Sequence, residues 1–131
     1  MGSIPLLDLA NCPCTGVTLD RLIQPAILTV LAEGPLHGYR LAERIAEMPT
    51  FSGQKPDVSG IYRFLKTMEQ KGLVVSTWDV SESGPARKSY EITSEGKRCL
   101  QQWIKTLEAY RRGIAELLRG ARKTLHQRHE S

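Results

Sequence analysis

Three cysteines carry the most reactive side chains of this 131-residue chain. Cys12 and Cys14 flank Pro13 in a stretch marked by glycine and proline, so burial on an apolar face accounts poorly for them. Two thiols one residue apart can ligate a soft metal or an iron–sulfur centre, or act as a redox pair, and Cys99 can supply a third ligand. Three ligands fall short of the usual four, and the spacing is not a standard zinc pattern. The sequence therefore requires no cofactor, and an exposed thiol pair without such a role is the alternative.

A second group of side chains has the chemistry of nucleic-acid binding. Four of them lie on one side of a predicted helix, opposite its apolar stripe: Ser59, Tyr62, Arg63 and Lys66. Arg63 can read a guanine edge, whereas Lys66 and the Tyr62 hydroxyl suit phosphates. Arg87 and Lys88 follow a predicted turn, from which they can grip the DNA backbone or the minor groove. The alternatives are a solvated face for the cations and, for Tyr62, a core aromatic with its hydroxyl at the surface.

Three helices and a hairpin must position these residues. Apolar side chains at helical spacing predict helices over residues 19–32, 37–48 and from Asp57 or Ser59 to about 71. Pro25 marks either the first turn of the first helix or a kink. In the second helix, the spacing predicts burial of Tyr39, Leu41 and Ile45.

The third helix and the hairpin have equally clear patterns. The apolar stripe of the helix consists of Ile61, Phe64, Leu65 and Met68, with Leu73 after the glycine stop at Gly72. Residues 73–80 are β-branched and aromatic, residues 81–86 form a turn, and residues 87–92 return as a second strand. We expect Trp78 to pack against the sheet.

A long helix follows, with Thr93 or Ser94 as its cap. Its apolar residues keep a heptad spacing: Leu100, Trp103, Leu107, Tyr110, Ile114, Leu117 and Ala121. About 30 residues of helix extend roughly 45 Å, beyond the body of a domain this size, so a second copy is the simplest partner and we predict a homodimer. Trp103 on this seam is either plain interface core or the place where a flat apolar effector stacks between two indoles. The basic residues from Arg111 to Arg128 are most simply a solvated helix end.

Composition and charge limit the class of protein. Hydrophobic residues make up 40% and charged residues 24%, which is typical of a globular domain. We expect no membrane span, no secretion and no disulfide scaffold, hence a cytoplasmic protein. Residues 93–131 carry nine basic against four acidic side chains, so the overall net charge of +4 is concentrated there and permits a nucleic-acid partner.

These elements predict a mainly α fold with a small β-hairpin (α+β): a winged helix-turn-helix followed by a long C-terminal dimerisation helix. We divide the chain into a flexible arm with the Cys-Pro-Cys motif (1–18), the winged helix-turn-helix (19–92), and the dimerisation helix with its basic tail (93–131).

The motifs LHGYRLAERI, PDVSGIYRFLKTMEQKGLV and RKSYEITSEGKRCL occur in this order and resemble those of the PadR-like transcriptional regulators. The resemblance covers about residues 24–105, and the single C-terminal helix is similar to the family's shorter branch. It implies a dimer, repression relieved by a small molecule or a stress signal, and a DNA-facing set of Tyr39, Ser59, Tyr62 and Lys66 with Arg87 and Lys88 at the hairpin. Val58-Ser59-Gly60-Ile61 departs from the serine, threonine and leucine often present there, which leaves the base contacts open.

We therefore predict a homodimeric repressor that binds a pseudo-palindromic operator in double-stranded DNA and is released by a small-molecule, metal or redox signal. The alternative is a winged-helix scaffold for protein–protein contact without an operator. An enzyme is not expected, because the sequence has no phosphate loop, dinucleotide fingerprint, paired metal histidines or triad.

Overall fold

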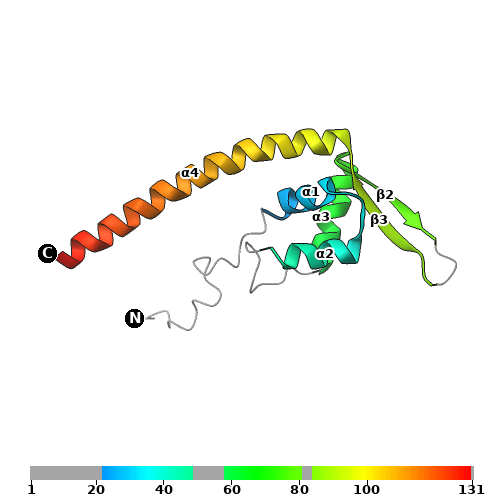
Figure 1. Ribbon diagram of the computed structural model, residues 1–131, viewed down its shortest axis with the longest axis horizontal. Coiled ribbons are helices and arrows are strands. Elements are labelled where there is room, and N and C mark those ends of the chain that lie inside the picture. The colour runs from blue at the N-terminus through cyan, green and yellow to red at the C-terminus, as the bar shows by residue number, and fades with distance from the viewer. Residues whose placement is uncertain (1–21, 49–57, 81–83, 131) are drawn as a thin grey trace, which may run out of the picture. The chain divides into compact units, whose positions relative to one another are not determined.

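The computed structural model describes residues 22–48, 58–80 and 84–130. The chain divides into two units, Met1–Lys97 and Arg98–Ser131, and each is described by itself. The elements follow one another in the order α1 (Ile23–Ala32), β1 (Leu36–His37), α2 (Gly38–Ala46), α3 (Val58–Gln70), β2 (Val74–Asp79), β3 (Arg87–Ile92) and α4 (Ser94–Glu130) (Figure 1).

The first unit has its core where the three short helices meet. Ile27, Leu28 and Leu31 of α1 are at most 1% exposed, and Leu41 and Ile45 of α2 are fully buried. Each such side chain stabilises the fold by about 1.5–3 kcal/mol through burial alone. Pro25 is the third residue of α1 and lies in its first turn rather than at a kink, where a missing amide proton costs no hydrogen bond.

The prediction that Tyr39 of the second helix is buried is wrong. Its side chain is 42% exposed, although Leu41 and Ile45 of the same helix are fully buried as predicted. Tyr39 is the second residue of α2 and precedes Leu41 by two positions, which places it about 200° around the helix axis. It therefore points away from the core.

Helix α3 packs through a narrower stripe than expected. Ile61, Leu65 and Met68 are fully buried, whereas Phe64 and Leu73 are only half-buried. Ser59 lies inside the helix and so does not cap it; Asp57, the other predicted cap, lies outside the described residues.

The sheet has three strands in the order β1-β3-β2, all antiparallel. The predicted hairpin is β2 and β3, and its second strand has the predicted bounds. The two-residue strand β1 was not predicted: Leu36 and His37 pair with Tyr90 and Ser89 of β3. A strand this short has no periodicity to detect. Figure 1 shows the far half of the β2–β3 ribbon extending beyond the helices.

Thr93 joins the end of α3 to the start of α4. Gly72 closes α3 with φ +78°, and the amide of Leu73 donates to the carbonyl of Met68 at 2.9 Å, as in a Schellman motif. The Thr93 hydroxyl donates to the Gly72 carbonyl at 2.6 Å and accepts from the Gly96 amide at 3.0 Å. Thr93, one of the two predicted caps, is thus the N-cap of α4. Gly96 leaves no room for a Cβ, because one would overlap the Leu73 carbonyl.

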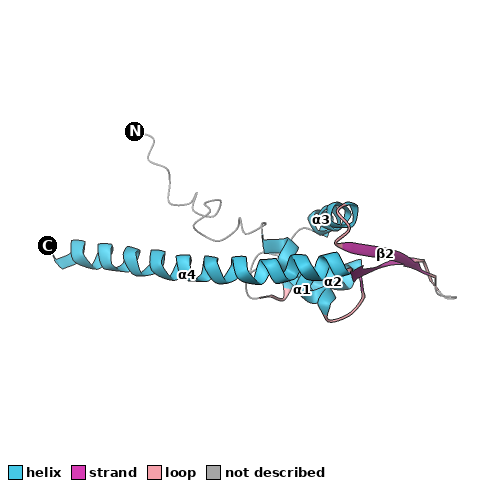
Figure 2. Ribbon diagram, turned by 90° about the horizontal axis from the view of Figure 1, so that it is seen from above, coloured by secondary structure: helices cyan, strands magenta, loops and turns pink. Residues whose placement is uncertain are grey.

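The described part of the second unit, residues 98–130, is helical throughout (Figure 2). Helix α4 is continuous from Ser94 to Glu130, so Gly113 and Gly120 do not interrupt it. Tyr110, Ile114 and Leu117 of the predicted seam are 54%, 64% and 73% exposed. Three apolar residues missed at the sequence level, Ile104, Leu118 and Leu125, are exposed as well and widen this stripe. Within the described residues, no helix combines the length and the apolar character that a membrane span requires.

Candidate nucleic-acid interface

A groove of about 860 Å³ lies between the first turn of α2, helix α3 and the β2–β3 ribbon. Five of the seven residues predicted to bind DNA line it, although they come from three different elements: Tyr39, Tyr62, Lys66, Arg87 and Lys88. We call it the α3–ribbon groove. It brings three cations and two phenol hydroxyls to one concave surface, which is the side-chain chemistry that binds phosphate oxygens.

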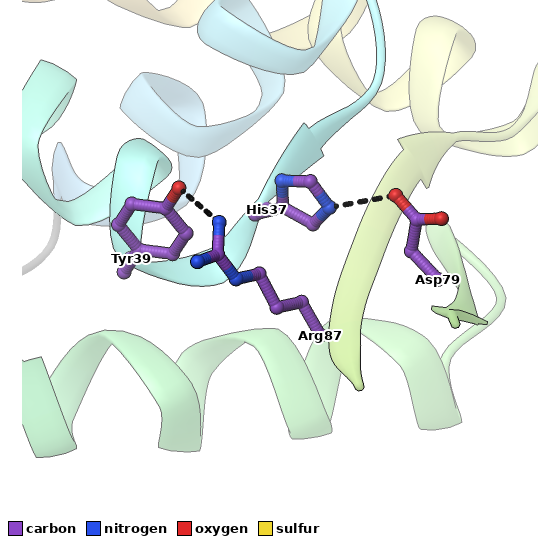
Figure 3. A network of polar contacts seen from close by, with 4 residues as sticks. All are labelled: His37, Tyr39, Asp79 and Arg87. Carbon is purple, nitrogen blue, oxygen red and sulfur yellow. Dashed lines mark hydrogen bonds and ion pairs between the residues drawn. The ribbon is translucent and has the colours of Figure 1, made fainter. Parts of the chain in front are cut away.

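Arg87 and Tyr39 contact each other at one side of this groove (Figure 3). The guanidinium donates a hydrogen bond to the Tyr39 hydroxyl at 2.9 Å, and its central carbon lies 5.2 Å from the centre of the phenol ring. Both side chains are exposed. The pair fixes the direction of the arginine while its remaining N–H groups can still donate to a ligand.

His37 and Asp79 extend the same network. The imidazole Nε2 donates to Asp79 Oδ2 at 3.1 Å, and the His37 ring stacks on Tyr39 with centroids 6.0 Å apart and planes 10° apart. Figure 3 shows the four side chains side by side, drawn from β1, α2, β2 and β3. His37 and Asp79 were missed at the sequence level, because they are 42 residues apart and no local pattern connects them.

Gly38 sets the position of Tyr62. A Cβ on Gly38 would lie 2.6 Å from both the hydroxyl oxygen and one ring carbon of Tyr62, much closer than van der Waals contact permits. The backbone of α2 and the phenol ring of α3 therefore approach as closely as a glycine permits. Tyr62 remains 40% exposed, so its hydroxyl is held at the groove surface.

Glu69 is the acidic residue that lines the groove. Its Oε2 accepts a hydrogen bond from the Ser76 hydroxyl at 2.6 Å, and its Oε1 lies 3.8 Å from Lys88 Nζ. The Lys88 ammonium also lies 5.6 Å from the centre of the Tyr90 ring. Burial raises the pKa of the Tyr90 phenol, and the charge of Glu69 and the nearby Tyr62 raise it further. Glu69 thus attaches the ribbon to α3 and offsets part of the positive charge of the groove.

Arg63 and Ser59 lie apart from the other predicted residues. Both are exposed on α3, but Arg63 lines a smaller hollow of about 260 Å³ together with Gln24 of α1 and Lys71. Arg63 follows Tyr62 directly, and consecutive residues of a helix differ by about 100° in direction. The α3–ribbon groove therefore does not include the residue expected to read a guanine.

The prediction for Trp78 is also wrong. We expected it to pack against the sheet, yet it is 65% exposed and lines the α3–ribbon groove. The burial of β2 falls from Val74, which is fully buried, to the three exposed residues Thr77, Trp78 and Asp79. Trp78 therefore faces a solvent-filled groove rather than a packed core, although its strand has a hydrophobic pattern.

The predicted effector and metal residues lie elsewhere. Trp103 on α4 is half-buried. Cys99 is a free, half-buried thiol, while Cys12 and Cys14 lie outside the described residues. The described part of the chain holds no group of three or more histidine, cysteine, aspartate or glutamate side chains placed to share a metal ion. A metal or redox site that uses Cys12 and Cys14 stays a prediction.

Three helices followed by an antiparallel ribbon, with a third short strand before α2, define a winged helix-turn-helix. Residues 27–102, more than half of the chain, match a family model described as "Transcriptional regulator PadR-like family". The chain belongs to this family of transcriptional regulators.

Solved structures agree with this membership. A candidate transcriptional regulator from Thermoplasma acidophilum is 37% identical with a TM-score of 0.68, over 76% of this chain and 93% of that one. A PadR family transcription regulator from Clostridium difficile is 26% identical with a TM-score of 0.65, over 74% and 98% of the two chains. Bacillus subtilis PadR in complex with operator DNA is 27% identical with a TM-score of 0.57, over 64% of this chain and 46% of that one. A comparison with curated proteins finds no match.

Proposed function

We propose that this chain is a homodimeric repressor that binds a pseudo-palindromic operator through α3 and the ribbon. The observation that carries this proposal is the α3–ribbon groove, where Tyr39, Tyr62, Lys66, Arg87 and Lys88 meet. Helix α3 would enter the major groove, and the strand of sugar and phosphate beside it would run along the α3–ribbon groove. The operator complex of the Bacillus subtilis relative supports this reading.

The side chains of the groove suit backbone contacts better than base contacts. Lys66 presents an ammonium, and the exposed residues Tyr39 (42%) and Tyr62 (40%) present hydroxyls. Both kinds of group bind phosphate oxygens without regard to sequence. Ser59 and Arg63 lie exposed on α3 outside this groove. In the proposed complex they face the base edges, where Arg63 reads a guanine.

The exposed stripe of α4 supports the dimer. Tyr110, Ile114 and Leu117 are each more than half exposed at a heptad spacing that a second copy of the helix would cover. Paired α4 helices would hold two α3 helices at a fixed separation, so that the operator half-sites lie about one or two turns of DNA apart.

A small-molecule effector would act on this pairing. An effector that binds beside the two Trp103 side chains would change the separation of the α3 helices and weaken DNA binding, with a coupling of about 1–3 kcal/mol. A regulator of chromosomal DNA would do this in the cytoplasm. The effector's test is a change in tryptophan emission on titration with planar aromatic compounds, matched by a loss of operator affinity.

The main experiment is fluorescence anisotropy of the full chain with a labelled duplex from the DNA upstream of its own gene, compared with a scrambled duplex over a salt series. We expect tighter binding to the upstream duplex and a steep loss of affinity with salt. Lys66→Ala should weaken binding to both duplexes and reduce the salt slope by about one, whereas Arg63→Ala should also relax the preference between them.

Lys105→Ala is the matched control, because Lys105 is an exposed lysine of α4 outside the α3–ribbon groove. A duplex selected from a random pool replaces the upstream duplex if the operator lies elsewhere. Weak, salt-insensitive binding to every duplex would contradict the proposal and favour a scaffold for protein contacts. A dependence of binding on reductant would implicate Cys12 and Cys14.

A further inference from the structure

Trp78 is a large aromatic side chain on β2 that the fold leaves in solvent. It is 65% exposed, although Val74 at the start of the same strand is fully buried. Tryptophan is one of the residue types enriched at interface hot spots, because its flat ring covers a large area at a small cost in conformational entropy. An exposed tryptophan at the edge of a charged groove therefore suggests a ligand contact.

The strand register places Trp78 on the groove side of the ribbon. Trp78 pairs with Lys88, and Ser76 pairs with Tyr90. Side chains two residues apart on a strand share a face, and Ser76 on this face donates to Glu69 of α3 at 2.6 Å. The face that carries Trp78 is thus the face directed at α3, with Trp78 one step farther out along the ribbon.

The charge around Trp78 indicates what covers it. Among the described residues that line the groove, Lys66, Arg87 and Lys88 are cations from two elements and Glu69 is the one carboxylate; the adjacent carboxylate of Asp79 is paired with His37. Lys88 already offsets Glu69 at 3.8 Å, which leaves Lys66 and Arg87 to bind an anion. A partner that presents repeated anionic groups beside flat apolar surface satisfies both features, and double-stranded DNA has this combination in its phosphates, deoxyriboses and base edges.

We propose that Trp78 is a DNA-contacting residue that packs its indole against deoxyribose and minor-groove base edges next to the strand held in the α3–ribbon groove. This inference rests on the proposed function and adds an apolar contact to its phosphate contacts. An apolar contact releases no counterions. Loss of Trp78 therefore lowers affinity equally at every salt concentration, which distinguishes it from Lys66 and Arg87.

The test measures operator affinity by anisotropy for the parent, Trp78→Ala and Trp78→Phe, with a duplex selected from a random pool. We expect Trp78→Ala to lower affinity about tenfold with an unchanged salt slope, and Trp78→Phe to retain most of the affinity. Val75→Ala is the control, because Val75 is a 46% exposed apolar residue of the same strand on its opposite face. Thermal unfolding should be unchanged in all three variants, since these side chains are exposed.

Tryptophan emission gives a second readout. The chain has two tryptophans, so the contribution of Trp78 is obtained by difference. The change in emission that DNA causes in Trp78→Phe is subtracted from the change that it causes in the parent. We expect DNA to shield this emission from acrylamide. If the parent binds its operator while Trp78→Ala binds within twofold of it, or if the substitution alters self-association instead, the inference is wrong and the proposed function stands. If the parent prefers no duplex, both fail.

Discussion

The guanidinium of Arg87 on β3 donates to the hydroxyl of Tyr39 on α2 at 2.9 Å, across 48 residues of sequence. The same guanidinium lies over the phenol ring at 5.2 Å. This contact ties the ribbon to the first turn of α2 and leaves both side chains at the surface. The arginine is thus oriented before any ligand arrives, which lowers the entropy that binding must remove.

Removal of the Tyr39 hydroxyl should therefore weaken DNA binding without unfolding the protein. We expect Tyr39→Phe to lower operator affinity about two- to tenfold, because the ring remains under Arg87 while the orienting hydrogen bond is lost. Arg87→Ala should lower it further and also reduce the salt slope by about one. In a double-mutant cycle, Tyr39→Phe should have a smaller effect in the Arg87→Ala background than in the parent, because only the phosphate contact of the hydroxyl itself is then lost. Additive effects would show that the pair does not act as a unit.

The approach of Gly38 to Tyr62 makes a second prediction. Gly38→Ala should destabilise the fold by no more than about 1 kcal/mol, because the added Cβ would lie 2.6 Å from the Tyr62 ring and hydroxyl, but these atoms are the far end of a 40% exposed side chain that can move away. It should also lower DNA affinity by displacing that hydroxyl. Chemical denaturation measures the first effect and anisotropy the second.

Tyr62→Ala provides the check on this explanation. It removes the atoms with which the new Cβ collides, so the double variant Gly38→Ala, Tyr62→Ala should be no less stable than Tyr62→Ala alone. If Gly38→Ala is still destabilising in the Tyr62→Ala background, its effect does not come from the contact with the phenol ring.

Tyr90 predicts how stability depends on alkaline pH. Burial, followed by the charge of Glu69 and then Tyr62, raises the pKa of this phenol above 10.0. The folded state therefore holds the proton more tightly than the unfolded chain, so the contribution is fully present below pH 10 and is lost as the pH rises through the folded-state pKa. Denaturation midpoints measured from pH 8 upward should fall above pH 10.

Two variants separate the causes of that loss. Tyr90→Phe should remove the loss of stability at alkaline pH that Tyr90 contributes. Glu69→Gln should make this loss smaller, since the Glu69 carboxylate is one of the groups that raise the pKa of Tyr90. An alkaline fall in Tyr90→Phe as large as that of the parent would assign it to other groups.

The sequence was sufficient for elements with a strong local signal. The second hairpin strand (Arg87–Ile92), the glycine stop at Gly72 and a helix cap at Thr93 or Ser94 follow from residue type and spacing, and the structure selects Thr93. The winged class and the DNA-facing set could be stated from these elements and from the order of the family motifs, and family membership is confirmed.

The geometry of the groove could not be predicted in this way, because it depends on where the ribbon lies against α3. Helical spacing gives the direction of Arg63 relative to Tyr62, but not which direction faces the ribbon. Trp78 has the local pattern of a packed strand residue and is nevertheless 65% exposed, because the space between the outer part of β2 and α3 is an open groove. His37 and Asp79 form a hydrogen bond although they are 42 residues apart in the sequence, and the residues next to either of them in the sequence do not predict this contact.

The exposed stripe of α4 leads to the last prediction, on the dimer. Ile114 and Leu117 are 64% and 73% exposed, and a second copy of α4 would bury both. The double substitution Ile114→Asp, Leu117→Asp should convert the proposed dimer to monomers in sedimentation, because two carboxylates per chain cannot be buried unpaired. Operator affinity should fall at least tenfold, since two half-sites are no longer bound together, whereas weak non-specific binding should persist. Arg112→Asp is the control, because Arg112 is exposed but lies outside the heptad positions of the stripe. A double variant that still sediments as a dimer would mean that other residues hold the two copies together.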